Sequence, residues 1–138
     1  MCSSDLTALG SLSAVDLRSP LETSEAARQF TDGAMVDGMT RAQDLFGVSG
    51  ERLDDTDWVQ SLTAWASNHK LEQIVTAQAA QGPVAERLAA ARRKLEPMGI
   101  RIAELTRAWD RAAWPHATKG FFQFREVIPA LIRLPSLD

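Results

Sequence analysis

Apolar positions along the first third of the chain recur every three or four residues, which predicts a long helix. The stretch Ser19-Pro20-Leu21-Glu22 is typical of a helix start, and Thr23 or Ser24 offers an alternative cap. Gly47 predicts the end of this helix. The predicted stripe of small and apolar residues, interrupted by one arginine, consists of Ala27, Phe30, Ala34, Gly38, Arg41 and Leu45.

The segments that flank this helix show weaker patterns. Residues 7–18 have no clear period and predict a loop or the remnant of a strand. Residues 47–55 are polar and predict a connection. Thr56 predicts the cap of a second helix. The apolar stripe predicted to bury this second helix consists of Trp58, Leu62 and Trp65.

The pattern then changes to a strand, a helix and a second strand. Leu71–Ala77 is short and β-branched at its centre, which predicts a strand. Gly82 and Pro83 open a third helix, and Gly99 stops it. Ile100–Leu105 predicts the next strand. Because this order requires a parallel pair with a right-handed crossover, we predict an α/β fold, a Rossmann-like three-layer domain with a short parallel sheet.

The stretch WPHATKGFF, residues 114–122, is the most unusual part of the chain. Trp114 precedes a proline and is predicted to be extended. Thr118 predicts the cap of a last helix, and Phe121 and Phe122 predict core positions in it. Two polar residues have no role in this structural interpretation and are candidates for contacts with a ligand or partner: His116 and Lys119.

The last segments complete the predicted elements. Residues 107–113 predict a short helix or turn. The apolar residues from 121 to 132 exceed what one narrow stripe needs, which predicts a heavily buried segment. Pro129 is expected to bend or end it.

Composition places the chain among ordinary globular domains. It has 138 residues, of which 45% are hydrophobic and 24% charged, and we treat residues 7–138 as a single cytoplasmic domain. No run approaches the roughly 18 apolar residues of a membrane span, so we expect no membrane partner. One cysteine and two histidines far apart in sequence do not form a metal-site pattern, so no metal is expected.

Charge is distributed unevenly along the chain. Residues 1–69 carry 4 basic and 11 acidic side chains, whereas residues 70–138 carry 11 basic and 7 acidic ones. A basic half could favour phosphate or nucleic acid. We favour the alternative that its main cluster is the solvated last turn of a helix, formed by Arg92, Arg93 and Lys94.

Candidate chemistry concentrates where the predicted strands end, because ligands of open α/β sheets bind beyond the carboxyl ends of the strands. The cofactor-binding candidates at this rim are Gln78, Gly82 and Asp110. Gly82 could present amides to a phosphate, or it could form a tight turn; the glycine-rich phosphate motifs are absent. Asp110 could form an acid–base pair with His116. The alternative is that Asp110 caps a helix or binds a nearby arginine, and that His116 fills a hydrogen-bonded corner. The sequence has no G-x-S-x-G motif, and no catalytic residue is assigned.

The first six residues, MCSSDL, match the translation of a sequencing-adapter end. We therefore expect residues 1–6 to be an artefact and the natural chain to be longer at its N-terminus. The alternative is a native polar terminus.

Two runs, QIVTAQAAQGPVAERL and RAWDRAAWPHATKGFFQFREVIPALI, with Gly99-Ile100 between them, resemble the C-terminal region of bacterial deoxyribodipyrimidine photolyase-like proteins. These are FAD-binding members of the photolyase/cryptochrome superfamily. The resemblance extends from about Ser19 to Leu134 and is most specific in Asp110–Phe124. The positions that match the family pattern are Gly82, Pro83, Asp110, Trp114, Pro115, His116, Thr118, Lys119, Gly120, Phe121 and Phe122.

The resemblance implies a flavoprotein parent in which a helical FAD domain precedes an antenna-like α/β region. The parent would be a lyase that repairs pyrimidine dimers in DNA by light, or a photoreceptor. FAD would bind to the helical domain, which would be the partner of this portion and the route to DNA. No segment matches the FAD-cradling helices, the tryptophan chain or the lesion pocket of the family, so this portion alone is expected to bind no FAD and to be inactive. Two other classes stay open: a free-standing α/β binding module, and a small nucleotide-binding hydrolase or transferase.

Overall fold

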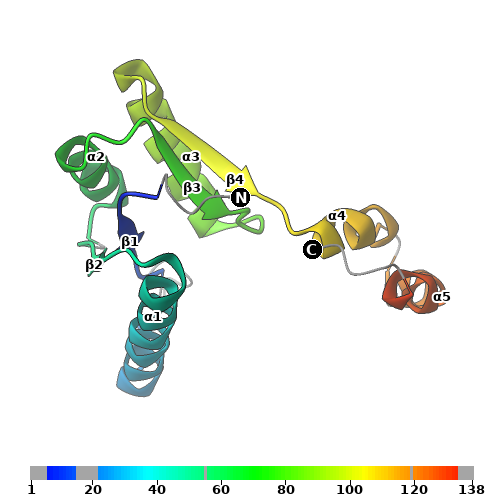
Figure 1. Ribbon diagram of the computed structural model, residues 1–138. Coiled ribbons are helices and arrows are strands. Elements are labelled where there is room, and N and C mark those ends of the chain that lie inside the picture. Colours follow the sequence, from blue (N-terminus) through cyan, green and yellow to red (C-terminus); the bar gives the residue numbers. More distant parts are fainter. Residues whose placement is uncertain (1–5, 15–21, 55, 119, 134–138) are drawn as a thin grey trace. The chain divides into compact units, whose positions relative to one another are not determined.

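The computed structural model describes residues 6–14, 22–54, 56–118 and 120–133, and it shows a mixed α/β architecture (Figure 1). The described strands form two separate parallel pairs, β1–β2 and β3–β4. Contacts divide the chain into two compact units. Unit 1 consists of Met1–Ile74 and Ala79–Ala103, and unit 2 consists of Val75–Gln78 and Glu104–Asp138.

The first parallel pair joins β1 (Leu9–Ser11) to β2 (Gly50–Arg52), with α1 (Glu25–Phe46) between them in sequence. For residues 7–18, the strand alternative is therefore confirmed at β1. The prediction of a plain connection over residues 47–55 is wrong, because β2 lies within it. Backbone hydrogen bonds hold this pair, and they need no apolar pattern in the side chains.

The ends of α1 follow from its capping residues. The Ser24 hydroxyl accepts a hydrogen bond from the Ala27 amide at 3.3 Å, which confirms one of the predicted caps. Gly47 ends the helix with a φ of 67°, and its N–H donates to the Gln43 carbonyl at 2.8 Å. The alternative start at Ser19 lies outside the described residues.

The apolar stripe predicted for α1 does not face a core. Phe30 and Leu45 in that stripe are 79% and 76% exposed, and none of the residues of α1 is buried. The helix instead packs on β1–β2 through another side, where Met39 contacts Gly50. The side of α1 that packs inward is therefore set by the two short strands. Because Gly50 has no side chain, α1 can approach β2 closely at this position.

The second helix, α2 (Trp58–Asn68), begins one residue later than predicted. Asp57 is its cap, because its carboxylate accepts hydrogen bonds from two amides of the first turn at 3.0 and 3.1 Å. Thr56 was the predicted cap, but its own amide donates to Asp54 at 3.0 Å. The predicted stripe is confirmed as buried: Trp58, Leu62 and Trp65.

The predicted strand–helix–strand unit is confirmed. It consists of β3 (Gln73–Ala77), α3 (Pro83–Leu95) and β4 (Arg101–Leu105). Hydrogen bonds at the two ends of the strand pair, 3.0 and 2.9 Å long, join residues whose numbers rise together, as parallel strands require. A 3₁₀ turn, η3 (Glu96–Met98), extends α3, and Gly99 stops it with a φ of 79°.

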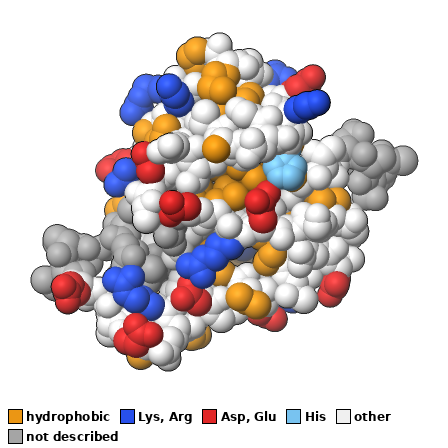
Figure 2. Space-filling view, turned by 90° about the vertical axis from the view of Figure 1, so that its left-hand side faces the viewer, with side chains coloured by type: hydrophobic (Ala, Val, Ile, Leu, Met, Phe, Trp, Pro, Cys, Tyr) orange, Lys and Arg blue, Asp and Glu red, His pale blue; other side chains and the backbone are white. Residues whose placement is uncertain are grey.

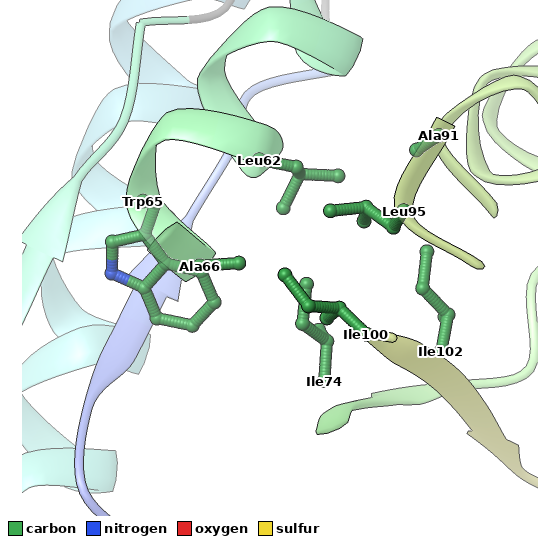
Figure 3. Packing of buried hydrophobic residues seen from close by; sticks show 8 residues of the cluster. All are labelled: Leu62, Trp65, Ala66, Ile74, Ala91, Leu95, Ile100 and Ile102. Carbon is green, nitrogen blue, oxygen red and sulfur yellow. The ribbon is translucent and has the colours of Figure 1, made fainter. Parts of the chain in front are cut away.

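The hydrophobic core lies in unit 1, where α2 and α3 meet the strands β3 and β4 (Figure 3). Isoleucines of the strand pair point toward apolar side chains of both helices, and Leu95 is fully buried among them. The cluster consists of Leu62, Trp65, Ala66, Ile74, Ala91, Leu95, Ile100 and Ile102. Burying one such leucine contributes roughly 2 kcal/mol.

The C-terminal part is helical. A short helix, α4 (Ala108–Ala113), confirms the predicted helix or turn and continues into a 3₁₀ turn, η4 (Trp114–His116). The last helix is α5 (Phe121–Ile132). Thr118 was predicted to cap it, but the cap is Gly120, whose φ of 89° a residue without a side chain adopts at little cost.

Three further expectations for this part are wrong. Trp114 is helical rather than extended, because Pro115 enters the first turn of η4, where its missing N–H costs no hydrogen bond. Phe121 and Phe122 are 63% and 74% exposed instead of lying in the core. The segment is not heavily buried, since of the described residues of α5 only Leu131 is buried. Pro129 lies inside α5 and does not end it, so of its two predicted effects only a bend stays a prediction.

Candidate functional site

The strand ends of unit 2 bring two polar side chains together as their position predicts. Gln78 follows β3, and its amide donates to the Leu105 carbonyl at 2.9 Å. Its side-chain oxygen accepts a hydrogen bond from the Thr106 hydroxyl, which follows β4. Parallel strands place these residues at the same edge of the sheet.

The residues after Thr106 continue this site. Arg107 donates from Nε to one oxygen of Asp110 at 2.7 Å and from Nη2 to the other at 3.0 Å. The hydrogen bonds, and then the charge of the carboxylate, raise the pKa of Arg107 above its ordinary value. Arg111 donates to the Thr106 carbonyl at 3.3 Å. We call the five residues the strand-end cluster: Gln78, Thr106, Arg107, Asp110 and Arg111.

This geometry limits the chemistry of Asp110. Both of its carboxylate oxygens accept hydrogen bonds from one guanidinium, which confirms the alternative that it binds a nearby arginine. His116 is exposed in η4, and no hydrogen bond between it and Asp110 occurs in the part of the chain that the structure describes. Because both oxygens are engaged by Arg107, neither is held ready to accept a proton from a substrate.

Gly82 belongs to unit 1 and precedes the first turn of α3. Its φ of 139° lies in the region that favours glycine. Pro83 removes one amide from this turn, and Glu86 adds a negative charge to it. These two features favour a tight turn over a phosphate site, because a carboxylate near the helix start repels a second anion.

The contact candidates of WPHATKGFF are only partly described. His116 is exposed, and Lys119 lies outside the described residues. The two phenylalanines at the start of α5 contact each other edge to face, with ring centroids 5.8 Å apart. The Arg125 guanidinium lies over the Phe122 ring, 5.9 Å from its centroid.

A second polar group, in unit 1, was not predicted. The side chains of Glu51 in β2 and His69 after α2 are hydrogen-bonded, with 2.7 Å between Oε1 and Nε2. The His69 ring lies against Trp65, with centroids 5.8 Å apart. Because β2 was not predicted and the two residues are 18 positions apart, no sequence signal linked them. Both side chains are partly exposed, so the pair mainly ties the end of α2 to β2.

Two further kinds of feature, a membrane-spanning helix and a metal-binding group, do not occur among the described residues. None of their helices has the length and apolar character that crossing a membrane requires. Nor do they contain a group of three or more histidine, cysteine or acidic side chains placed to bind a metal ion. Comparisons of the chain with protein-family models, with curated proteins and with solved structures find no match.

Proposed function

We propose that the chain is the C-terminal α/β portion of a FAD-dependent photolyase or cryptochrome-like protein, in which it docks on a helical flavin domain. FAD would bind to the flavin domain, and light-driven repair of pyrimidine dimers or photoreception would occur there. DNA would be reached through that domain. The α/β portion would supply a contact surface and no catalytic group. The observation that carries the proposal is the exposed outer face of α1.

The two sides of α1 differ in what they contact. On the inner side, Asp32 binds Arg52 of β2 at 2.8 Å and Met39 packs on Gly50. The outer side carries the apolar stripe that includes Phe30 and Leu45. Large exposed apolar side chains gain free energy when a partner covers them, so a stripe along a 22-residue helix is typical of a contact surface. Figure 2 likewise draws hydrophobic side chains at the surface among charged ones.

The strand-end cluster supports docking over the hydrolase or transferase alternative. Its polar groups bind one another, most clearly Arg107 with Asp110. A catalytic rim would need a group held ready for substrate, with a base or nucleophile in reach.

The proposal also includes the fold of the whole α/β portion, which we propose to be a Rossmann-like three-layer domain. In β1–β2, Gly10 and Gly50 lie on opposite faces, because Gly10 pairs with the residue that follows Gly50. Trp65 of α2 contacts Gly10, and Met39 of α1 contacts Gly50. Helices on both faces of a parallel pair are the local arrangement that a three-layer domain repeats.

Binding to a purified helical flavin domain of a bacterial photolyase-like protein tests the proposal. We expect calorimetry to measure binding between the two proteins. We expect Phe30→Ser or Leu45→Ser to weaken this binding about tenfold or more. Val36→Ser is the matched control: Val36 is exposed on the same helix, about 240° around from Phe30. Absence of binding by the unmodified chain would refute the docking function. Binding that Phe30→Ser and Leu45→Ser leave unchanged would refute the role of α1.

A further inference from the structure

The β3–β4 pair has one covered face and one open face. Ile74, Ile100 and Ile102 lie in the core on the covered face. Because side chains alternate along a strand, Val75 and Leu105 point to the other face, where they are 50% and 61% exposed. Parallel strands are normally covered by helices on both faces. Among the described residues, no layer therefore covers the side chains of Val75 and Leu105 completely.

α5 carries a matching apolar side. Phe121, Phe122 and Ile132 are exposed, and at about 100° per residue they fall within about 100° of one another around the helix. Leu131, which is buried, lies about 80° from Phe121, on the side away from Phe122. The 12 residues of α5 span about 18 Å, and the five residues of each strand span about 16 Å. One helix of this length is enough to cover the open face.

We propose that α5 is a strap that closes over the open face of β3–β4, with its exposed phenylalanines against Val75 and Leu105. Both surfaces belong to unit 2, and residues 106–120 connect them. The contact is therefore intramolecular, and the high effective concentration of a short tether favours it. Closure removes large apolar side chains of both surfaces from water. Arg125, whose guanidinium lies over the Phe122 ring, keeps its charged end in water at the edge of the contact.

The strap is independent of the proposed function, because it uses no residue of α1. Cysteine cross-linking in the full chain tests it, with Cys2→Ser to remove the one cysteine of the sequence. We expect Leu105→Cys with Phe122→Cys to form an intramolecular disulfide about tenfold faster than Leu105→Cys with Gln123→Cys. Gln123 is the matched control, because it is exposed next to Phe122 but on another side of the helix. Equal rates, or disulfides only between two copies, would overturn the strap.

Hydrogen exchange gives a second measurement that needs no cross-link. Leu105→Asp places a charge on the open face, and we expect the α5 amides to exchange about tenfold faster, with α3 unchanged. Val36→Asp on α1 is expected to leave α5 unchanged. Exchange in α5 that does not respond to Leu105→Asp would contradict closure. Protection of α5 that rises with protein concentration would assign the open face to a second copy and would also overturn the strap.

Discussion

Trp58 donates its indole N–H to the backbone carbonyl of Ser13 at 3.1 Å, and so ties the start of α2 to the segment that follows β1. Both residues are buried. Trp65, two turns further along the same helix, is also buried, but its indole N–H has no hydrogen-bond partner among the described residues. The two tryptophans thus differ in one hydrogen bond while their burial is similar.

This difference predicts unequal costs for the same substitution. Both Trp58→Phe and Trp65→Phe remove apolar volume, but only the first removes a buried hydrogen bond. We expect Trp58→Phe to lower the free energy of unfolding by about 1–2 kcal/mol more than Trp65→Phe. Urea denaturation of the two variants measures it. An equal cost, or a larger one at Trp65, would contradict the assignment.

Close packing of α1 on β2 predicts that Gly50 accepts a side chain only if the Met39 side chain moves. A Cβ at Gly50 would overlap the Met39 sulfur and lie 3.1 Å from its Cγ. We expect Gly50→Ala to destabilise the protein by about 1–3 kcal/mol, because Met39 must leave its position. Gly33→Ala is the matched control within α1: a Cβ there meets nothing within 4 Å.

For that control we expect a gain of up to about 1 kcal/mol, since alanine is the better helix former. Thermal unfolding of both variants gives the sign directly. A Gly50→Ala protein of unchanged stability would show that the Met39 side chain does not need its position against Gly50.

The core predicts a large cavity effect at Leu95. This side chain is fully buried between α3 and the strands. Leu95→Ala is expected to cost about 2–5 kcal/mol in denaturant unfolding. Leu45→Ala removes the same atoms from an exposed site and is expected to cost less than about 0.5 kcal/mol. Similar costs at the two sites would place the core elsewhere.

Asp54 predicts a specific acid sensitivity. Hydrogen bonds from the backbone and then the side chain of Thr56 lower the pKa of its carboxyl below 3.8. A carboxyl with a lower pKa in the folded state stabilises the fold above its unfolded pKa, and this contribution is lost as the pH falls through the lowered value. The stability difference between the native chain and Asp54→Asn is therefore expected to be constant above about pH 5 and to shrink below it.

NMR titration of the Asp54 carboxyl measures its pKa directly. Denaturation curves of both proteins, recorded from neutral to acid pH, measure the stability difference. A pKa at or above 3.8, or a stability difference that does not change with pH, would remove the basis of this prediction.

The candidate site was predictable only in part. Gln78 and the residues after Leu105 were placed at one rim because parallel strands carry their ends to the same edge. Asp110 and Arg107 are three positions apart, so a local ion pair was among the alternatives. The pair of Glu51 and His69 was not, because it depends on a strand whose side chains carry no apolar alternation.

The sequence by itself determined the βαβ unit from Gln73 to Leu105, the buried stripe of α2 and the glycine stops at Gly47 and Gly99. These features depend on spacing, capping and backbone conformation within a few residues, which are local properties. Only the tertiary structure decided that β1 pairs with β2 and which side of α1 meets them. Strand pairing uses backbone groups that every residue has, and the buried side of a helix depends on what lies beside it, so neither is encoded in a local pattern.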